Sequence, residues 1–258
     1  MNQNNWKRRK FYKYASIESA LIIINDSTLK FTTPDKFNDP FDIYPYFPRA
    51  GFTKMVERVR NENGNQDPRF SRKELEQMFK VANTPKFRQE TSKNSAVCCF
   101  SKSATILPMW AHYADNHKGC VIEFEMKYED AVKAATIMLS TRIYRESEIL
   151  TPIDVTYSNK RPPAYDSEGS TQSKSLAAVF TKATQWSYEE EVRCVKNNVS
   201  GIYPFPRHQL KKIIFGLRTT ENDKQKIREM LKKVSSEHNI FIDAKEINME
   251  RETYNLFF

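Results

Sequence analysis

The division of this chain into elements is decided by the stretch Phe11-Tyr-Lys-Tyr-Ala-Ser-Ile-Glu-Ser-Ala-Leu-Ile-Ile-Ile-Asn-Asp-Ser-Thr-Leu-Lys-Phe-Thr32. Phe11–Tyr14 predicts a short strand, and Ser16 is a residue that can cap a helix over Ile17–Asn25. Thr28–Thr32 alternates between polar and apolar side chains, as a half-buried strand does. The chain therefore opens with a strand, a helix and a second strand.

Further elements follow along the chain and close with another strand, helix and strand. The pattern predicts an α+β fold with a mixed sheet core and flanking helices. We expect strands at Val97–Ser101, Cys120–Glu125, Ile153–Tyr157, Glu189–Val195, Lys212–Gly216 and Ile240–Asp243, and helices at Leu107–Asn116, Tyr128–Leu139, Ser175–Thr184 and Glu221–Ser235.

Two segments interrupt this alternation. Residues 52–92 are polar and charged with weak helical periodicity, so we expect a helical insert on the surface. Ser158–Ser173 contains Pro162, Pro163 and Gly169, which predicts a mobile loop. A length of 258 residues suits a single domain, 1–258, that carries the insert.

Composition limits the partners and the compartment. The 41 Lys and Arg exceed the 32 Asp and Glu, and this net charge of +9 favours polyanionic partners such as nucleic acid. The excess gathers in residues 6–13 and 207–233, although each could be an ordinary solvated face. No apolar run is long enough for a membrane span. Four cysteines without a C-x-x-C pair predict a reduced, cytoplasmic protein with no zinc or other metal site.

Three groups of residues could carry chemistry. In a strand, Glu189, Glu191 and Arg193 of the segment Trp186–Arg193 would share one face, where they could position a sugar hydroxyl and stabilise positive charge. The alternative is a solvent-facing charge ladder. Trp110 and Tyr113 could pack in the core or stack on a planar ligand ring. The remaining group combines Tyr12, Lys13 and Tyr14 with the turn Asn38–Asp42, and Tyr12 and Tyr14 would share a face with Lys13 opposite. Phosphate-loop, nucleophile-elbow, zinc-protease and dinucleotide-binding motifs are absent from the sequence.

Several short motifs in order resemble a widespread bacterial family of uncharacterised domains. The segments Phe37–Asp42 and Trp186–Arg193 are the most specific to that family. The others are Tyr12–Tyr14, Cys99–Ser101, Met109–Tyr113 and His117–Gly119.

The layout also resembles, more distantly, the ADP-ribosyltransferases, particularly the bacterial toxins that modify DNA. That resemblance implies NAD as the cofactor, Glu191 as the catalytic glutamate that holds the ribose, and Glu189 as the group that orients or deprotonates the acceptor. It also implies a nucleic-acid or protein acceptor, a role as a toxin or anti-phage effector, and a neutralising partner protein. The first strand lacks the arginine or histidine that usually contacts NAD, and the usual Ser-Thr-Ser is absent. The residues expected to contact NAD in their place are Tyr12, Lys13, Tyr14, Ser101, Tyr113 and Arg193.

Two other functions are compatible with the same residues. In a metal-dependent nuclease, Asp39 or Asp42 would join Glu189 and Glu191 around Mg²⁺, with Lys182 nearby. In a non-catalytic module that binds nucleic acid or a partner protein, the same motifs would serve the fold alone.

Overall fold

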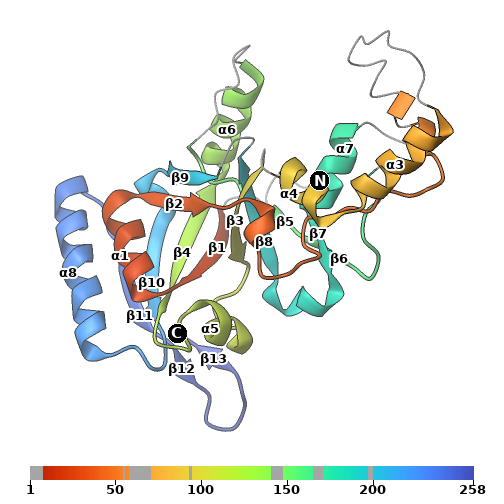
Figure 1. The fold of residues 1–258 in the computed structure, drawn as a ribbon. Coiled ribbons are helices and arrows are strands. Elements are labelled where there is room, and N and C mark those ends of the chain that lie inside the picture. Colours follow the sequence, from red (N-terminus) through yellow and green to blue (C-terminus); the bar gives the residue numbers. More distant parts are fainter. Residues whose placement is uncertain are drawn as a thin grey trace.

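A seven-stranded sheet forms the centre of the molecule, with the strand order β11-β10-β4-β1-β3-β8-β5 (Figure 1). The computed structural model describes residues 8–54, 56–57, 71–92, 95–140, 148–164, 171–196 and 200–258. Its neighbouring strands are antiparallel except for β10 and β11, so the expected α+β class is confirmed as a mainly antiparallel sheet with several helices. The strands are β1 (Arg8–Ala15), β3 (Ala96–Ser101), β4 (Cys120–Lys127), β5 (Ile153–Asp154), β8 (Glu191–Lys196), β10 (Leu210–Phe215) and β11 (Asp243–Glu246).

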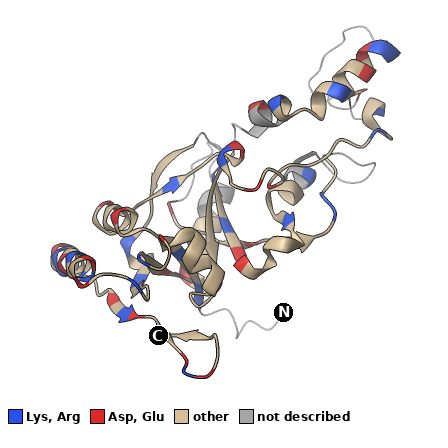
Figure 2. Cartoon of the chain, turned by 60° about the horizontal axis from the view of Figure 1, so that its bottom comes forward, with Lys and Arg blue, Asp and Glu red and all other residues tan. Residues whose placement is uncertain are grey.

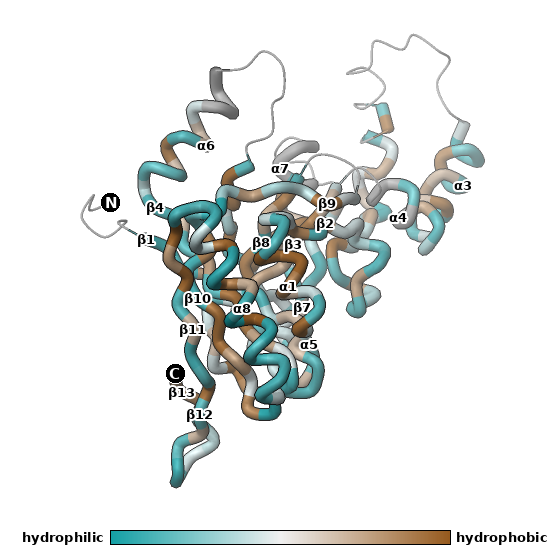
Figure 3. The backbone as a smooth tube through the Cα atoms, turned by 90° about the vertical axis from the view of Figure 1, so that its left-hand side faces the viewer, coloured by the Kyte–Doolittle hydropathy of each residue, from teal (hydrophilic) through white to brown (hydrophobic). Residues whose placement is uncertain are grey.

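Two helices cover one face of this sheet and close the main core. α1 (Ile17–Asp26) and α8 (Glu221–His238) lie side by side there, and their apolar side chains pack with Phe11, Phe124 and Ile213 (Figure 1). Ser16 caps α1 as predicted, because its Oγ accepts a hydrogen bond from the Ser19 N–H at 3.2 Å. Figure 3 shows the hydrophobic residues concentrated in the central strands and α1, whereas the loop between β12 and β13 is hydrophilic.

The opposite face carries a shorter helix and a hairpin. α5 (Leu107–Tyr113) buries Trp110, whose Nε1 donates to the Ala104 carbonyl at 2.8 Å. Below it lie β12 (Asn248–Met249) and β13 (Leu256–Phe257) (Figure 1). The prediction that this helix runs to Asn116 is wrong, because residues 115–117 all have positive φ and turn the chain toward β4.

The surface insert is helical in the part that the structure describes. It contains α3 (Arg72–Ala82) and α4 (Pro85–Ser92), whereas residues 55 and 58–70 lie outside the described ranges. Phe52, Val56 and Ala82 are buried in a small core of their own, packed by neighbouring aromatic rings. The insert therefore has its own apolar contacts.

Other elements differ from the prediction where distant segments pair. The helix expected over Ser175–Thr184 is α7 (Thr171–Val179), and it ends early because β7 (Thr181–Ala183) pairs with β6 (Thr156–Ser158). The strand expected over Ile153–Tyr157 is divided, since β5 joins β8 instead. Within the expected mobile loop, Ser158–Ser173, residues 165–170 lie outside the described ranges. The remaining elements are β2 (Thr28–Phe31), β9 (Gly201–Pro204), α6 (Tyr128–Ser140), and the 3-10 helices η2 (Pro34–Lys36), η3 (Thr184–Glu189) and η4 (Arg207–Gln209).

The last predicted strand is shifted along the chain. The strand expected over Ile240–Asp243 begins at Asp243, which pairs with Lys212 of β10. Asn239 ends α8 in the left-handed conformation, and Ile242 is buried in the main core before the ladder starts. Ile240 also packs against that core, whereas Phe241 is exposed, so the segment does not continue the ladder.

Much of the positive charge in residues 207–233 is paired within the chain. Figure 2 shows basic and acidic residues together along α8. Lys224 and Arg228 both form ion pairs with Glu246, and Arg207 donates to the carbonyls of Ile24 and Asn25 at the end of α1. This pairing weakens the prediction that the segment binds nucleic acid. None of the described helices combines the length and the apolar character that a membrane span needs.

Candidate functional site

A pocket of about 650 Å³ opens where β1 and β3 separate. β1 pairs with β4 along its whole length, but it pairs with β3 only at Tyr12 and Ser101. Beyond that point the Lys13 ammonium donates to the Cys99 carbonyl at 2.9 Å, so a side chain takes the place of a ladder hydrogen bond. We call this line between the two strands the seam.

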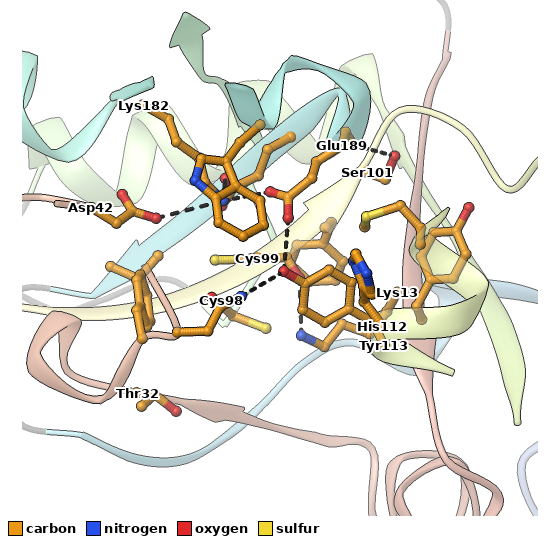
Figure 4. A pocket seen from close by; sticks show the side chains of 18 of the residues that line it. Lys13, Thr32, Asp42, Cys98, Cys99, Ser101, His112, Tyr113, Lys182 and Glu189 are labelled. Carbon is orange, nitrogen blue, oxygen red and sulfur yellow. Dashed lines mark hydrogen bonds and ion pairs between the residues drawn. The ribbon is translucent and has the colours of Figure 1, made fainter. Parts of the chain in front are cut away.

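The seam pocket brings together side chains of three kinds (Figure 4). Carboxylates lie close to lysine ammonium groups, and aromatic rings form much of the remaining wall. The carboxylates are Asp42, Glu189 and Glu191, the lysines are Lys13, Lys30, Lys36 and Lys182, and the aromatic residues are Tyr12, Tyr14, Phe37, Phe100, Tyr113 and Trp186.

The residues predicted from the sequence meet at this one place. Those that line the pocket are Tyr12, Lys13, Tyr14, Ser101, Tyr113, Glu189 and Glu191. Arg193 is the exception: it is fully buried behind the wall and contacts Glu191 and Asp42. Ser101 acts within the protein, since its hydroxyl donates to the Glu189 carbonyl at 2.7 Å.

Glu189 is held between two donors (Figure 4). The Tyr113 hydroxyl donates to Oε1 at 2.7 Å, and the Lys182 ammonium donates to Oε2 at 2.5 Å. The strand predicted to begin at Glu189 begins at Glu191 instead, because Glu189 ends η3 and Glu190 turns the chain with a φ of 46°. The alternation argument is therefore wrong for Glu189, although its carboxylate still lies beside that of Glu191 around Lys182.

Glu191 belongs to a buried ion-pair network. Arg193 donates through Nε to its Oε1 at 2.7 Å and through Nη2 to Asp42 at 2.7 Å. The side-chain exposure of Arg193 is 0% and that of Glu191 is 3%, so a solvent-facing charge ladder is excluded. Burial alone would raise the pKa of Glu191, but the charges and hydrogen bonds of Arg193 and Lys182 outweigh burial and lower the pKa to about 2. Glu191 is ionised and fully paired at neutral pH.

Lys182 connects the carboxylates, although the resemblance to ADP-ribosyltransferases implies no role for it or for Asp42. Its ammonium lies 3.0 Å from Glu191, 3.6 Å from Asp42 and 5.1 Å from the centre of the Trp186 ring. Burial by itself lowers the pKa of Lys182, but the three carboxylates outweigh it and hold the pKa above its ordinary value. Asp42 ends the motif Phe37–Asp42, but no local motif contains Lys182, and the fold brings the two together from separate elements.

Part of this chain is similar to a known protein family. Residues 109–194 match DUF2971, a family of proteins of unknown function. The matched segment contains Tyr113, Lys182, Glu189, Glu191 and Arg193, whereas Tyr12–Tyr14 and Phe37–Asp42 lie outside it. No match was found among curated proteins or among solved structures. The wider family resemblance and the likeness to ADP-ribosyltransferases stay predictions.

The described acidic residues of the matched segment do not form a metal-binding group. Within the described ranges, no three His, Cys, Asp or Glu side chains are arranged to hold a metal ion. Asp42, Glu189 and Glu191 surround the Lys182 ammonium instead, and Arg193 pairs with two of them. Their negative charge is thus largely compensated by the protein's own cations.

Proposed function

We propose that this protein is an NAD-dependent ADP-ribosyltransferase whose NAD binds in the seam pocket. The observation that carries the proposal is the buried Glu189 carboxylate, which Tyr113 and Lys182 hold at the wall of an aromatic-lined pocket. A fixed carboxylate in such surroundings suits a reaction in which positive charge develops on a sugar ring.

The pocket fits the chemical parts of NAD. Its volume of about 650 Å³ is typical of small-molecule sites. Trp186 and Tyr113 offer faces for a planar ring, and Glu189 can accept a hydrogen bond from a ribose hydroxyl. Lys30 and Lys36 are exposed residues that line the same pocket and can pair with phosphates.

The two glutamates have different tasks in this proposal. NAD supplies the ADP-ribosyl group, whose bond to nicotinamide breaks with the electron pair leaving on nicotinamide while the acceptor bonds to the same carbon. Glu189 orients the ribose and takes the proton that the acceptor loses. Tyr113 and Lys182 hold Glu189 in place. Glu191 is occupied by Arg193 and Lys182, so we assign it to positioning Lys182 and Glu189 rather than to ligand contact.

The test compares Glu189→Gln with its neighbour Glu190→Gln. Both changes remove one charge and keep the side-chain shape, but Glu189 is buried in the site and Glu190 is exposed. The purified proteins are incubated with NAD labelled in the adenylate group, and released nicotinamide and labelled acceptors in a cell lysate are measured.

We expect nicotinamide release by the wild type and by Glu190→Gln, and a loss of about 100-fold or more in Glu189→Gln. The proposal fails if Glu189→Gln turns over NAD as fast as the wild type, or if the wild type neither binds NAD in calorimetry nor consumes it. The proposed role as a toxin or anti-phage effector adds a cellular readout: the wild type should slow growth when expressed, and Glu189→Gln should not.

A further inference from the structure

A second cavity, of about 430 Å³, lies next to the seam pocket. Lys182 and Trp186 line both cavities, so they form the shared wall. Two further segments line the second cavity: the turn that contains Asp39, Phe41 and Tyr44, and the residues from Ser158 to Pro162. The remaining lining residues, Thr181, Ala183 and Gln185, neighbour Lys182 and Trp186 in the chain. A group bound there would meet Lys182, whose ammonium donates to Glu189 of the seam pocket.

Cations and aromatic rings meet in this second cavity. The Arg161 guanidinium lies over the rings of Phe41 and Tyr44, at 5.6 and 5.4 Å from their centres. Phe41 is 60% exposed, so its side chain is open to a bound group. Lys160 lines the cavity beside Arg161. Flat apolar faces next to fixed positive charge are what the base and phosphate of a single-stranded nucleotide need.

One buried acceptor in this cavity lacks a donor. Asp39 is 4% exposed, and its Oδ1 accepts the Phe41 N–H at 2.8 Å, which fixes the turn. Its Oδ2 is buried and receives no hydrogen bond from the described residues. Because an unsatisfied buried acceptor is costly, a ligand that offers an N–H to this oxygen gains from the match.

We propose that the second cavity binds one amino-bearing base of single-stranded nucleic acid and presents it as the acceptor. Its ring would stack on Phe41, its phosphate would pair with Arg161 and Lys160, and its amino group would donate to Asp39. The two cations oppose an arginine or lysine side chain of a protein acceptor. The acceptor role rests on the proposed function, whereas binding of the base does not.

Asp39 also predicts which bases bind. Cytosine, adenine and guanine carry an exocyclic amino group that can donate to a carboxylate. Thymine and uracil carry one N–H on the ring, between two carbonyl oxygens. A carboxylate that approaches this N–H is repelled by both oxygens. Cytosine and thymine are the sharpest pair for a test, since both are pyrimidines of similar size.

The experiment measures binding without NAD, so it is independent of turnover. Fluorescence anisotropy is recorded with labelled oligodeoxycytidine, oligothymidine and oligocytidine RNA of about 12 nucleotides. In Asp39→Asn, Oδ1 can still accept the Phe41 N–H while an amide donor replaces the unsatisfied acceptor. Asp35→Asn, at an exposed site on η2, is the matched control.

We expect the wild type and Asp35→Asn to bind oligodeoxycytidine about tenfold more tightly than oligothymidine. Asp39→Asn should reduce that preference to about twofold or less. Arg161→Gln should weaken the binding of both oligonucleotides and lower the salt dependence of their affinity. The RNA tells whether the sugar matters. If Asp39→Asn does not fold, Phe41→Ala, at an exposed ring, should weaken all oligonucleotides by about tenfold.

Three results would overturn this assignment: equal affinity of the wild type for cytosine and thymine, an unchanged preference in folded Asp39→Asn, or unchanged affinity in Phe41→Ala. An arginine-rich peptide that binds more tightly than the oligonucleotides, and loses affinity in Asp39→Asn, would assign the cavity to a protein acceptor instead. Intact base preference without NAD turnover would refute the proposed function and leave the base site standing.

Discussion

Glu189 and Glu191 stand two positions apart and share Lys182, but their other partners differ. Glu189 accepts from Tyr113 and Lys182, whereas Glu191 is bound on both oxygens by Arg193 and also meets Lys182. Removing the Glu191 charge leaves two buried cations partly uncompensated. Glu191→Gln should therefore lower the free energy of unfolding at pH 7 by about 3 kcal/mol. Urea denaturation measures this, with Glu190→Gln expected near the wild type; equal stability of Glu191→Gln and wild type would contradict it.

Tyr113 offers a second residue-scale prediction. Burial and the neighbouring Glu189 raise the pKa of Tyr113, so its hydroxyl stays protonated and donates to Glu189 at neutral pH. Tyr113→Phe removes that donor and keeps the ring. We expect NAD affinity within about twofold of the wild type and a turnover about tenfold lower. Steady-state kinetics separates the two, and a rise in KM with unchanged kcat would instead assign Tyr113 to ligand binding.

At the scale of elements, two glycines beside the ends of β4 and β10 allow backbone segments to approach each other closely. A Cβ on Gly119 would lie 2.1 Å from the Ala15 carbonyl oxygen, and one on Gly216 would lie 2.2 Å from that of His117. Backbone atoms cannot yield as a side chain can, so Gly216→Ala should cost about 3 kcal/mol of stability. Gly201→Ala, whose Cβ would meet only the Tyr203 ring at 3.4 Å, is the control and should cost less than about 1 kcal/mol. Similar losses in thermal or urea unfolding would refute the steric account.

Local patterns in the sequence predict the elements that depend on local contacts. α1 with its Ser16 cap, the apolar strands β3 and β4, and the long helix α8 all follow from periodicity and capping. The pattern misses β9, β12 and β13, because these short strands form only by pairing with another strand. In β9, for example, Tyr203 pairs with Leu29 of β2. It also places Glu189 in a strand, since a 3-10 turn such as η3 has no distinct hydrophobic period.

The candidate site is less predictable than the fold. Spacing alone brings Glu191 and Arg193 to one face of β8, but it gives no reason for their burial. Asp42 and Lys182 reach the same network from a turn and from β7, so only the tertiary structure joins them. The motifs contain most of the predicted residues that line the seam pocket, whereas the contacts between these residues follow only from the folded chain.

At the scale of the whole molecule, the buried network makes stability depend on pH. The pKa of Glu191 falls from 4.5 to about 2 on folding, so Glu191 stabilises the fold fully above pH 4.5 and loses this contribution as the pH falls toward 2. The stability difference between wild type and Glu191→Gln should shrink by about 3 kcal/mol over that interval. Urea unfolding at a series of pH values measures it, and a constant difference would show that Glu191 does not titrate as inferred.

The seam also determines how the sheet deforms. On one side of it lie β11, β10, β4 and β1, and on the other lie β3, β8 and β5, with a single backbone pair joining the two groups. We therefore expect the sheet to bend most easily along the seam, between these two groups of strands. A molecule that binds across the seam would hold the two groups together and slow amide hydrogen exchange in β1 and β3 together. Mass spectrometry with NAD added can record this change. Exchange that slows in only one of the two groups of strands would mean that the molecule does not bridge the seam.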